Sequence, residues 1–161
     1  MYKKINTILI FVLLALSCSL IAAYIIEYGL GHKPCKLCLY QRIPYIISVL
    51  LILNFLIIKK YQKTSLLILS AISLCGSALA FYHFGIEQGF FSESSVCEAQ
   101  TLTGETLNKE EVLKQLKQGT VSCKDINFTV FGFSLASINA IFSLILFVIF
   151  MQLYKNYEAN W

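Results

Sequence analysis

Four long stretches without a charged residue decide what this chain can fold into. They span residues 5–26, 43–58, 65–86 and 128–153, and polar connectors separate them. A bilayer core about 30 Å thick is crossed by roughly 20 helical residues. Because 57% of the residues are hydrophobic and only 14% are charged, the chain lacks the charge to coat a soluble domain. The sequence therefore predicts an all-α integral membrane protein, a four-helix bundle built from a single domain over residues 1–161.

Two of these runs leave a choice about where a helix begins. Lys3 and Lys4 before the first run are also typical of a signal peptide, but the run is longer than a usual signal core, so we expect a retained span. The second run is short for a membrane crossing, so its helix is expected to begin earlier, near Leu37. Such a start places Arg42 in the first turns of the helix, at the depth of the membrane interface.

Four crossings place both termini on one side of the membrane and the connectors 27–41 and 87–127 together on the other side. These two connectors are the outer loops of the expected fold. The connector at residues 59–63 is dense in lysine, which favours the cytoplasmic side for it and for the termini. The loops that carry cysteines then face the outer, oxidising compartment, where disulfides persist.

The second outer loop contains a pattern typical of a short helix. Asn108 fits an N-cap with Glu111 three residues later, and Gly119 fits the stop. The apolar side chains between them fall on one helical face, namely Val112, Leu113 and Leu116. We expect a short amphipathic helix over residues 109–118 that rests either on the membrane surface or on the bundle.

The six cysteines divide into two groups. Cys18 and Cys75 fall inside apolar runs, where cysteine usually behaves as a small buried hydrophobe. The other four lie in the polar loops, at Cys35, Cys38, Cys97 and Cys123. Cys35 and Cys38 form a Cys-x-x-Cys motif at the mouth of a helix, and a helix N-terminus stabilises a thiolate. Together with His32, the same spacing also fits part of a zinc site.

Helical spacing places Cys35, Cys38 and Arg42 on one face of the second helix. Because arginine keeps its charge, Arg42 would stabilise a thiolate on Cys38 and offer hydrogen-bond donors to a neutral oxygen acceptor in the lipid. The alternative is that Arg42 only extends its charge toward water at a helix end. Glu27 and Glu87, at the ends of other spans, are expected to be solvated.

Cys97 and Cys123 lie in the same outer loop, and their spacing allows two functions. They could close a structural disulfide, which restricts the unfolded chain and stabilises the fold by roughly 3 kcal/mol. They could equally form a labile pair that exchanges with a partner protein, because the surrounding loop is polar and accessible. A labile pair would allow a relay in which Cys35 and Cys38 reoxidise it.

Three motifs carry a resemblance to a known family. They are Cys35-Lys-Leu-Cys-Leu-Tyr-Gln-Arg42, Tyr82–Gly89 and Phe131–Asn139. Together with four spans and four loop cysteines, these motifs resemble the DsbB family, the quinone-dependent membrane oxidases that make disulfides. The resemblance covers essentially the whole chain.

The resemblance implies a role for each loop cysteine. Cys97 would form a mixed disulfide with a soluble thioredoxin-like dithiol oxidase of the DsbA type. Cys123 would be its loop partner, able to join Cys35 in a transient interloop disulfide. Cys38 would be the thiolate that meets the quinone.

The resemblance also implies a cofactor site. Arg42 would hold a carbonyl oxygen of ubiquinone or menaquinone, and His83 would lie nearby at the end of the third span. Gln41 precedes Arg42 and is expected only to shape the start of the second helix.

The leading hypothesis is therefore a protein-disulfide oxidase, a dithiol:quinone oxidoreductase without a metal. It would sit in the bacterial inner membrane with cytoplasmic termini and periplasmic cysteine loops, and it would reoxidise a DsbA-type partner. A zinc-clasped tetraspan membrane scaffold or assembly factor is the alternative from another class, and the same chemistry run as a reductase is a third. No nucleic-acid partner is expected, because the lysines form no basic stripe.

Overall fold

The computed structural model describes residues 2–59, 61–92, 97, 122–124, 129–130 and 132–158. Its long helices are α1 (Tyr2–Tyr24), which continues into the π-helical turn η1 (Ile25–Gly29), α2 (Lys36–Ile57), α3 (Gln62–Glu87) and α5 (Leu135–Glu158). All four are long and apolar enough to cross a membrane. The expectation of a four-helix membrane protein is thus confirmed.

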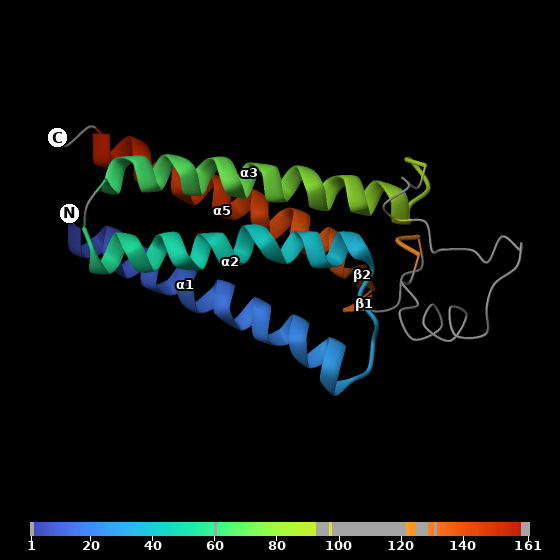
Figure 1. Cartoon of the computed structure of the whole chain (residues 1–161). Helices are drawn as coiled ribbons and strands as arrows, with labels where there is room; N and C mark the ends of the chain where they lie inside the picture. The colour runs from blue at the N-terminus through green and yellow to red at the C-terminus, as the bar shows by residue number, and fades with distance from the viewer. Residues whose placement is uncertain are drawn as a thin grey trace, which may run out of the picture.

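The helices run along one another, as Figure 1 shows. Both ends of the chain lie at one end of the bundle, and the described parts of the two cysteine loops lie at the other. The expected amphipathic helix over 109–118, with its cap at Asn108 and its stop at Gly119, falls outside the described residues.

Helix α2 begins where the cysteine motif begins. Cys35 is the N-cap residue with extended backbone, and its sulfur accepts a hydrogen bond from the backbone N–H of Cys38 at 3.2 Å. The helix therefore starts at Lys36, one residue before Leu37. This local capping, rather than the apolar run from residue 43, sets the start of the second span.

Helix α5 begins at Leu135, later than the charge-free run that starts at Phe128. A hairpin of β1 (Thr129–Val130) and β2 (Phe133–Ser134) occupies the residues before it. Gly132 turns the hairpin with a φ of +84°, which favours glycine. Ser134 then caps the helix, because its Oγ accepts the N–H of Ser137 at 3.2 Å.

The main apolar core lies in the half of the bundle that carries the termini. It contains fully buried side chains from all four helices, including Leu9, Leu16, Ile52, Phe55, Leu66 and Phe150. A second, smaller cluster surrounds the loop cysteines and contains Leu37 and Ile86. The tight core and the cysteine cluster therefore occupy opposite ends of the bundle.

The outward faces of the helices are apolar as well. Phe11, Leu50, Phe81 and Ile141 are all exposed on the protein surface. Cys18 and Cys75 are also exposed, so the expectation that they are buried inside the protein is wrong. Because both lie within membrane-spanning helices, their surroundings in a bilayer are lipid rather than water.

Candidate functional site

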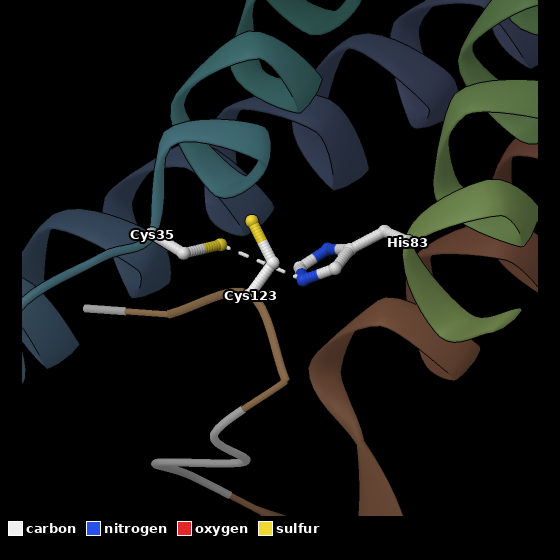
Figure 2. Close-up of side chains that lie close together, drawn as sticks. All are labelled: Cys35, His83 and Cys123. Atoms are coloured by element: carbon white, nitrogen blue, oxygen red, sulfur yellow. Dashed lines mark hydrogen bonds between the residues drawn. The ribbon is translucent and has the colours of Figure 1, made fainter. Parts of the chain in front are cut away.

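The structure brings all four loop cysteines to the same end of the bundle. Cys97 and Cys123 form a disulfide, whereas Cys35 and Cys38 are free thiols whose sulfur atoms lie 2.8 Å apart. The sulfur of Cys123 lies within 4.8 Å of the sulfur of Cys35. Figure 2 shows Cys35 before α2 and Cys123 on its loop, side by side and facing His83 of α3. The two cysteine pairs are therefore close enough to exchange with little movement.

The electrostatics of the site favour a thiolate on Cys35. A hydrogen bond with Cys38 and the nearby His83 lower the pKa of the Cys35 thiol to about 5, although burial acts to raise it. The backbone N–H of Cys38 and the N-terminal end of α2 act in the same direction. The sequence pointed to Cys38 as the thiolate because of Arg42, but the N-cap position gives this advantage to Cys35.

His83 joins the cysteines to polar side chains of α2 and α5 that are buried or partly buried. Its Nε2 lies 3.5 Å from the sulfur of Cys35, and its Nδ1 lies 3.1 Å from Nε2 of Gln41. Gln41 is 7% exposed, and its Oε1 accepts a hydrogen bond from Nδ2 of Asn139 at 2.7 Å. The expectation that Gln41 only shapes the helix start is therefore wrong, since its side chain links α2 to α3 and α5.

Arg42 is held by a partner that sequence reasoning did not assign to it. Its Nη1 donates to Oε2 of Glu27 at 2.5 Å, and the two side chains are 13% and 18% exposed. The guanidinium also lies over the ring of Tyr24, 4.9 Å from its centroid. Glu27 is thus a half-buried ion-pair partner rather than a solvated residue.

The side chain of Glu87, at the end of α3, is largely covered rather than solvated. Its Oε1 lies 3.7 Å from Nε2 of His83, and its side chain is 7% exposed. Its Oε2 is buried and has no hydrogen-bond partner among the described residues. A charge at the end of an apolar run was visible in the sequence, but only the packing of α3 against the cysteine loops shows that it is covered.

A cavity of about 510 Å³ connects these groups. Cys35, Cys38, Arg42 and His83, four of the six predicted site residues, line it together with Glu27. The rest of its wall is largely apolar and includes Leu20, Ala23, Ile26, Leu135 and Phe142. Small-molecule sites in proteins have this size and this mixture of apolar surface with a few polar groups.

The zinc alternative meets a chemical difficulty at this site. Cys35, His83 and Cys123 place possible ligand atoms within 4.8 Å of one another. Zinc is bound by thiolate sulfur, but the sulfur of Cys123 is already joined to Cys97. This donor set is better suited to thiol–disulfide exchange than to a closed zinc site.

Comparisons with known proteins agree with this chemistry. The sequence matches the family described as disulfide bond formation protein DsbB over residues 5–153. It is also 30% identical over 161 residues to a Rickettsia prowazekii (strain Madrid E) protein described as uncharacterized protein RP370, and this similarity covers 99% of the present chain and 91% of the relative. The four apolar helices and the family together indicate a multi-pass protein of the inner membrane. The chain belongs to the DsbB family, and it is a membrane disulfide oxidoreductase.

Proposed function

We propose that the protein oxidises a periplasmic thioredoxin-like dithiol protein of the DsbA type and passes the electrons to a membrane quinone. The observation that carries the proposal is the position of the Cys35 sulfur, within 4.8 Å of Cys123 in the loop disulfide and 2.8 Å from Cys38 at the cavity. This sulfur can exchange with the loop pair on one side and with Cys38 on the other.

The first half of the reaction takes place at the loop pair. A thiolate of the partner attacks the sulfur of Cys97, the bond to Cys123 breaks, and Cys123 leaves as a thiolate. The second partner thiolate then attacks the partner sulfur of this mixed disulfide, and Cys97 leaves. The partner is oxidised by two electrons, and Cys97 and Cys123 are reduced by the same two.

The second half transfers these electrons to the pair beside the cavity. Starting from a Cys35–Cys38 disulfide, the Cys123 thiolate attacks Cys35 and Cys38 leaves as a thiolate. Cys97 then attacks Cys123, and Cys35 leaves. The product has a Cys97–Cys123 disulfide and a reduced Cys35/Cys38 pair, which is the connectivity of this structure.

The residues that line the cavity fit a quinone head group. The DsbB family is quinone-dependent in general, and a bound quinone supplies the acceptor for two electrons. Arg42 can orient a carbonyl oxygen, because a guanidinium has five N–H donors and the ion pair with Glu27 leaves others for a second acceptor. Cys38 and His83 line the same cavity, so the reduced cysteine pair borders this space.

We also propose that the cysteine loops are periplasmic and that both termini are cytoplasmic. Both termini lie at the same end of the bundle (Figure 1), and α2 is followed there by Lys59 and by Lys63 in the first turn of α3. Lysine-rich connectors favour the cytoplasm, and disulfide exchange with a secreted partner needs the oxidising side.

The test is turnover of the purified full-length protein with a reduced thioredoxin-like protein and a soluble ubiquinone or menaquinone analogue. We expect one quinone to be reduced for each dithiol oxidised, followed by ultraviolet absorbance and by alkylation of the remaining thiols. Cys38→Ser should stop the reaction. The matched control is Cys75→Ser, which makes the same atomic change on an exposed face of α3 and should leave turnover intact.

Two outcomes would contradict the proposal. Quinone reduction that survives Cys38→Ser would remove Cys38 from the electron path. Stoichiometric zinc in the preparation, with four reactive loop thiols after denaturation, would favour the zinc-clasped scaffold instead.

A further inference from the structure

A chain of polar side chains, buried at Tyr45 and Gln41 and partly buried at Asn139, runs from α5 and α2 to His83. The hydroxyl of Tyr45 donates to Oδ1 of Asn139, and Nδ2 of Asn139 donates to Oε1 of Gln41 at 2.7 Å. Nε2 of Gln41 then lies 3.1 Å from Nδ1 of His83. We call Tyr45, Asn139 and Gln41 the amide chain. It contacts the histidine on the ring nitrogen that faces away from the cysteines.

The amide chain has a direction. A side-chain NH₂ group only donates hydrogen bonds, and an amide oxygen only accepts them. Oδ1 of Asn139 has two hydroxyl donors, Tyr45 and, at 3.4 Å, Ser143. Nδ2 of Asn139 donates to Oε1 of Gln41, so Gln41 presents its own NH₂ group to His83.

This direction determines which ring nitrogen of His83 carries the proton. Nδ1 faces a donor, so it must accept and be unprotonated. A neutral imidazole with a bare Nδ1 carries its proton on Nε2. Nε2 lies 3.5 Å from the sulfur of Cys35 and 3.7 Å from Oε1 of Glu87, so both neighbours of this N–H are acceptors.

Burial makes this arrangement hard to reverse one residue at a time. His83 is 3% exposed, and Gln41 and Tyr45 are also buried. Rotation of the Gln41 amide alone would set its NH₂ group against that of Asn139 and its oxygen against Nδ1 of His83. The hydrogen bonds between these amides therefore favour a change of direction in both together.

We propose that Gln41 and Asn139 are positioning residues that hold His83 as the neutral tautomer with its Nε2–H directed at the Cys35 thiolate. The inference rests on the proposed function, in which this thiolate exchanges with Cys123. The arrangement resembles enzyme sites in which a histidine activates a nucleophile and a third group orients the histidine. Its particular consequence is that a neutral N–H donor, rather than an imidazolium, faces the sulfur.

Other charged or titratable groups face Cys35 as well, and the test must hold them constant. They are the thiol of Cys38, the carboxyl of Glu87 and, in the wall of the same cavity, Lys33 and His32. The variants below leave these groups unchanged, with two exceptions. His32→Asn serves only to assign the NMR signals. Cys38→Ser is present in both proteins of the alkylation test, with and without Asn139→Leu.

The first test is ¹⁵N NMR of histidine in the detergent-solubilised full chain. The chain has two histidines, and His32→Asn assigns the signals of His83. At pH 7 we expect His83 to be neutral with the proton on Nε2. Gln41→Glu places a carboxylate against Nδ1, so Nδ1 should become protonated. Gln62→Glu is the matched control, because it makes the same change where Gln62 accepts from Tyr157 at the other end of the bundle.

The second test uses Asn139→Leu, which leaves the contact between Gln41 and His83 in place. The readout is the pH profile of Cys35 alkylation in a background where Cys38 is serine and the other four cysteines are alanine. We expect the midpoint to rise by about one pH unit, a roughly tenfold smaller thiolate fraction in acid. A merely structural role for Asn139 would lower stability without moving this midpoint.

The possible results separate this inference from the proposed function. An imidazolium at His83 in the unmodified protein at pH 7, or an unchanged Nε2–H tautomer in Gln41→Glu, would overturn the inference. The expected tautomers in a protein that oxidises no dithiol would support the inference while refuting the proposed function.

Discussion

The low pKa of Cys35 leads to a quantitative prediction about acidification. At pH 5 about half of Cys35 should be thiolate, because its pKa is lowered from 9.0 to about 5. A thiol that keeps a pKa of 9.0 has only about one part in 10,000 as thiolate at that pH. Cys35 should therefore remain reactive at pH values where an ordinary thiol is inert.

The expected difference in alkylation rate is smaller than the difference in thiolate fraction. A thiolate of lower pKa is a weaker nucleophile, and with a Brønsted coefficient of about 0.4–0.5 this shift slows each thiolate by roughly 40- to 100-fold. The net expectation is that Cys35 is alkylated about 50- to 125-fold faster than an ordinary thiol at pH 5. At pH 7 the same arithmetic predicts rates within about a factor of three.

The assay is a pH series of iodoacetamide labelling of the reduced protein, read by peptide mass spectrometry. Trypsin cleaves after Lys36, so Cys35 and Cys38 fall on different peptides, and Cys18→Ala makes Cys35 the only cysteine on its own peptide. The unfolded protein in denaturant is the control, and its profile should have a midpoint near 9. A midpoint above 8 in the folded protein would refute the argument from the helix N-terminus, Cys38 and His83.

The lowered pKa of Cys35 also predicts how the stability of the fold changes with pH. The folded state holds Cys35 as a thiolate more readily than the unfolded state does, so this group stabilises the fold fully above the unfolded pKa near 9. Acidification from about pH 9 to pH 5 should remove that contribution progressively. The midpoint of denaturant unfolding, followed by circular dichroism with the cysteines reduced, should fall over this range.

Three further predictions concern other parts of the molecule. Arg42→Ala should raise the KM for the quinone about 10- to 100-fold, which is the effect of losing a charged hydrogen-bond donor. A larger rise in the KM for the dithiol protein would argue against a role of Arg42 in holding the quinone. Gly85→Ala should destabilise the fold by about 1–3 kcal/mol in thermal unfolding, because the new Cβ would collide with the ring of Phe91. Gly29→Ala is the control and should change stability little, because its Cβ meets only an ordinary contact at 3.5 Å. Cys18→Ala should leave turnover unchanged because Cys18 is a free, exposed thiol outside the cavity, and loss of activity would show that the cysteines were sorted wrongly.

The sequence was sufficient for the parts of the fold that depend on length and hydropathy. Four apolar runs, three of them of bilayer length, indicated helices, because a single segment in lipid can satisfy its own backbone only as a helix. The gathering of the loop cysteines at one end followed from the number of crossings. The start of α5 at Leu135 did not follow, because Phe128–Ser134 also carries no charge, and only the hairpin and the Ser134 cap show where the helix begins.

The partners of the site residues depend on how the helices are rotated, which one sequence does not determine. Gln41 and Asn139 lie in helices far apart in the chain, and nothing in their spacing indicates that they meet. The pairing of Glu27 with Arg42 was open to inference, since a cation partly removed from water is stabilised by an anionic partner. The preference for Cys35 as thiolate was also accessible, because Cys35 directly precedes the helix and an N-cap sulfur faces its free N–H groups.

The π-helical turn η1 has a consequence for insertions and deletions. A π-helical turn arises when one extra residue is accommodated in an α-helix, and here it carries Glu27 to Arg42. Deletion of one residue within Ile25–Gly29 would restore α-helical geometry and turn the residues beyond it by about 100° around the helix axis. The ion pair therefore depends on the number of residues in this segment as much as on their identity, so length changes here should be tolerated far less than substitutions of its lipid-facing side chains.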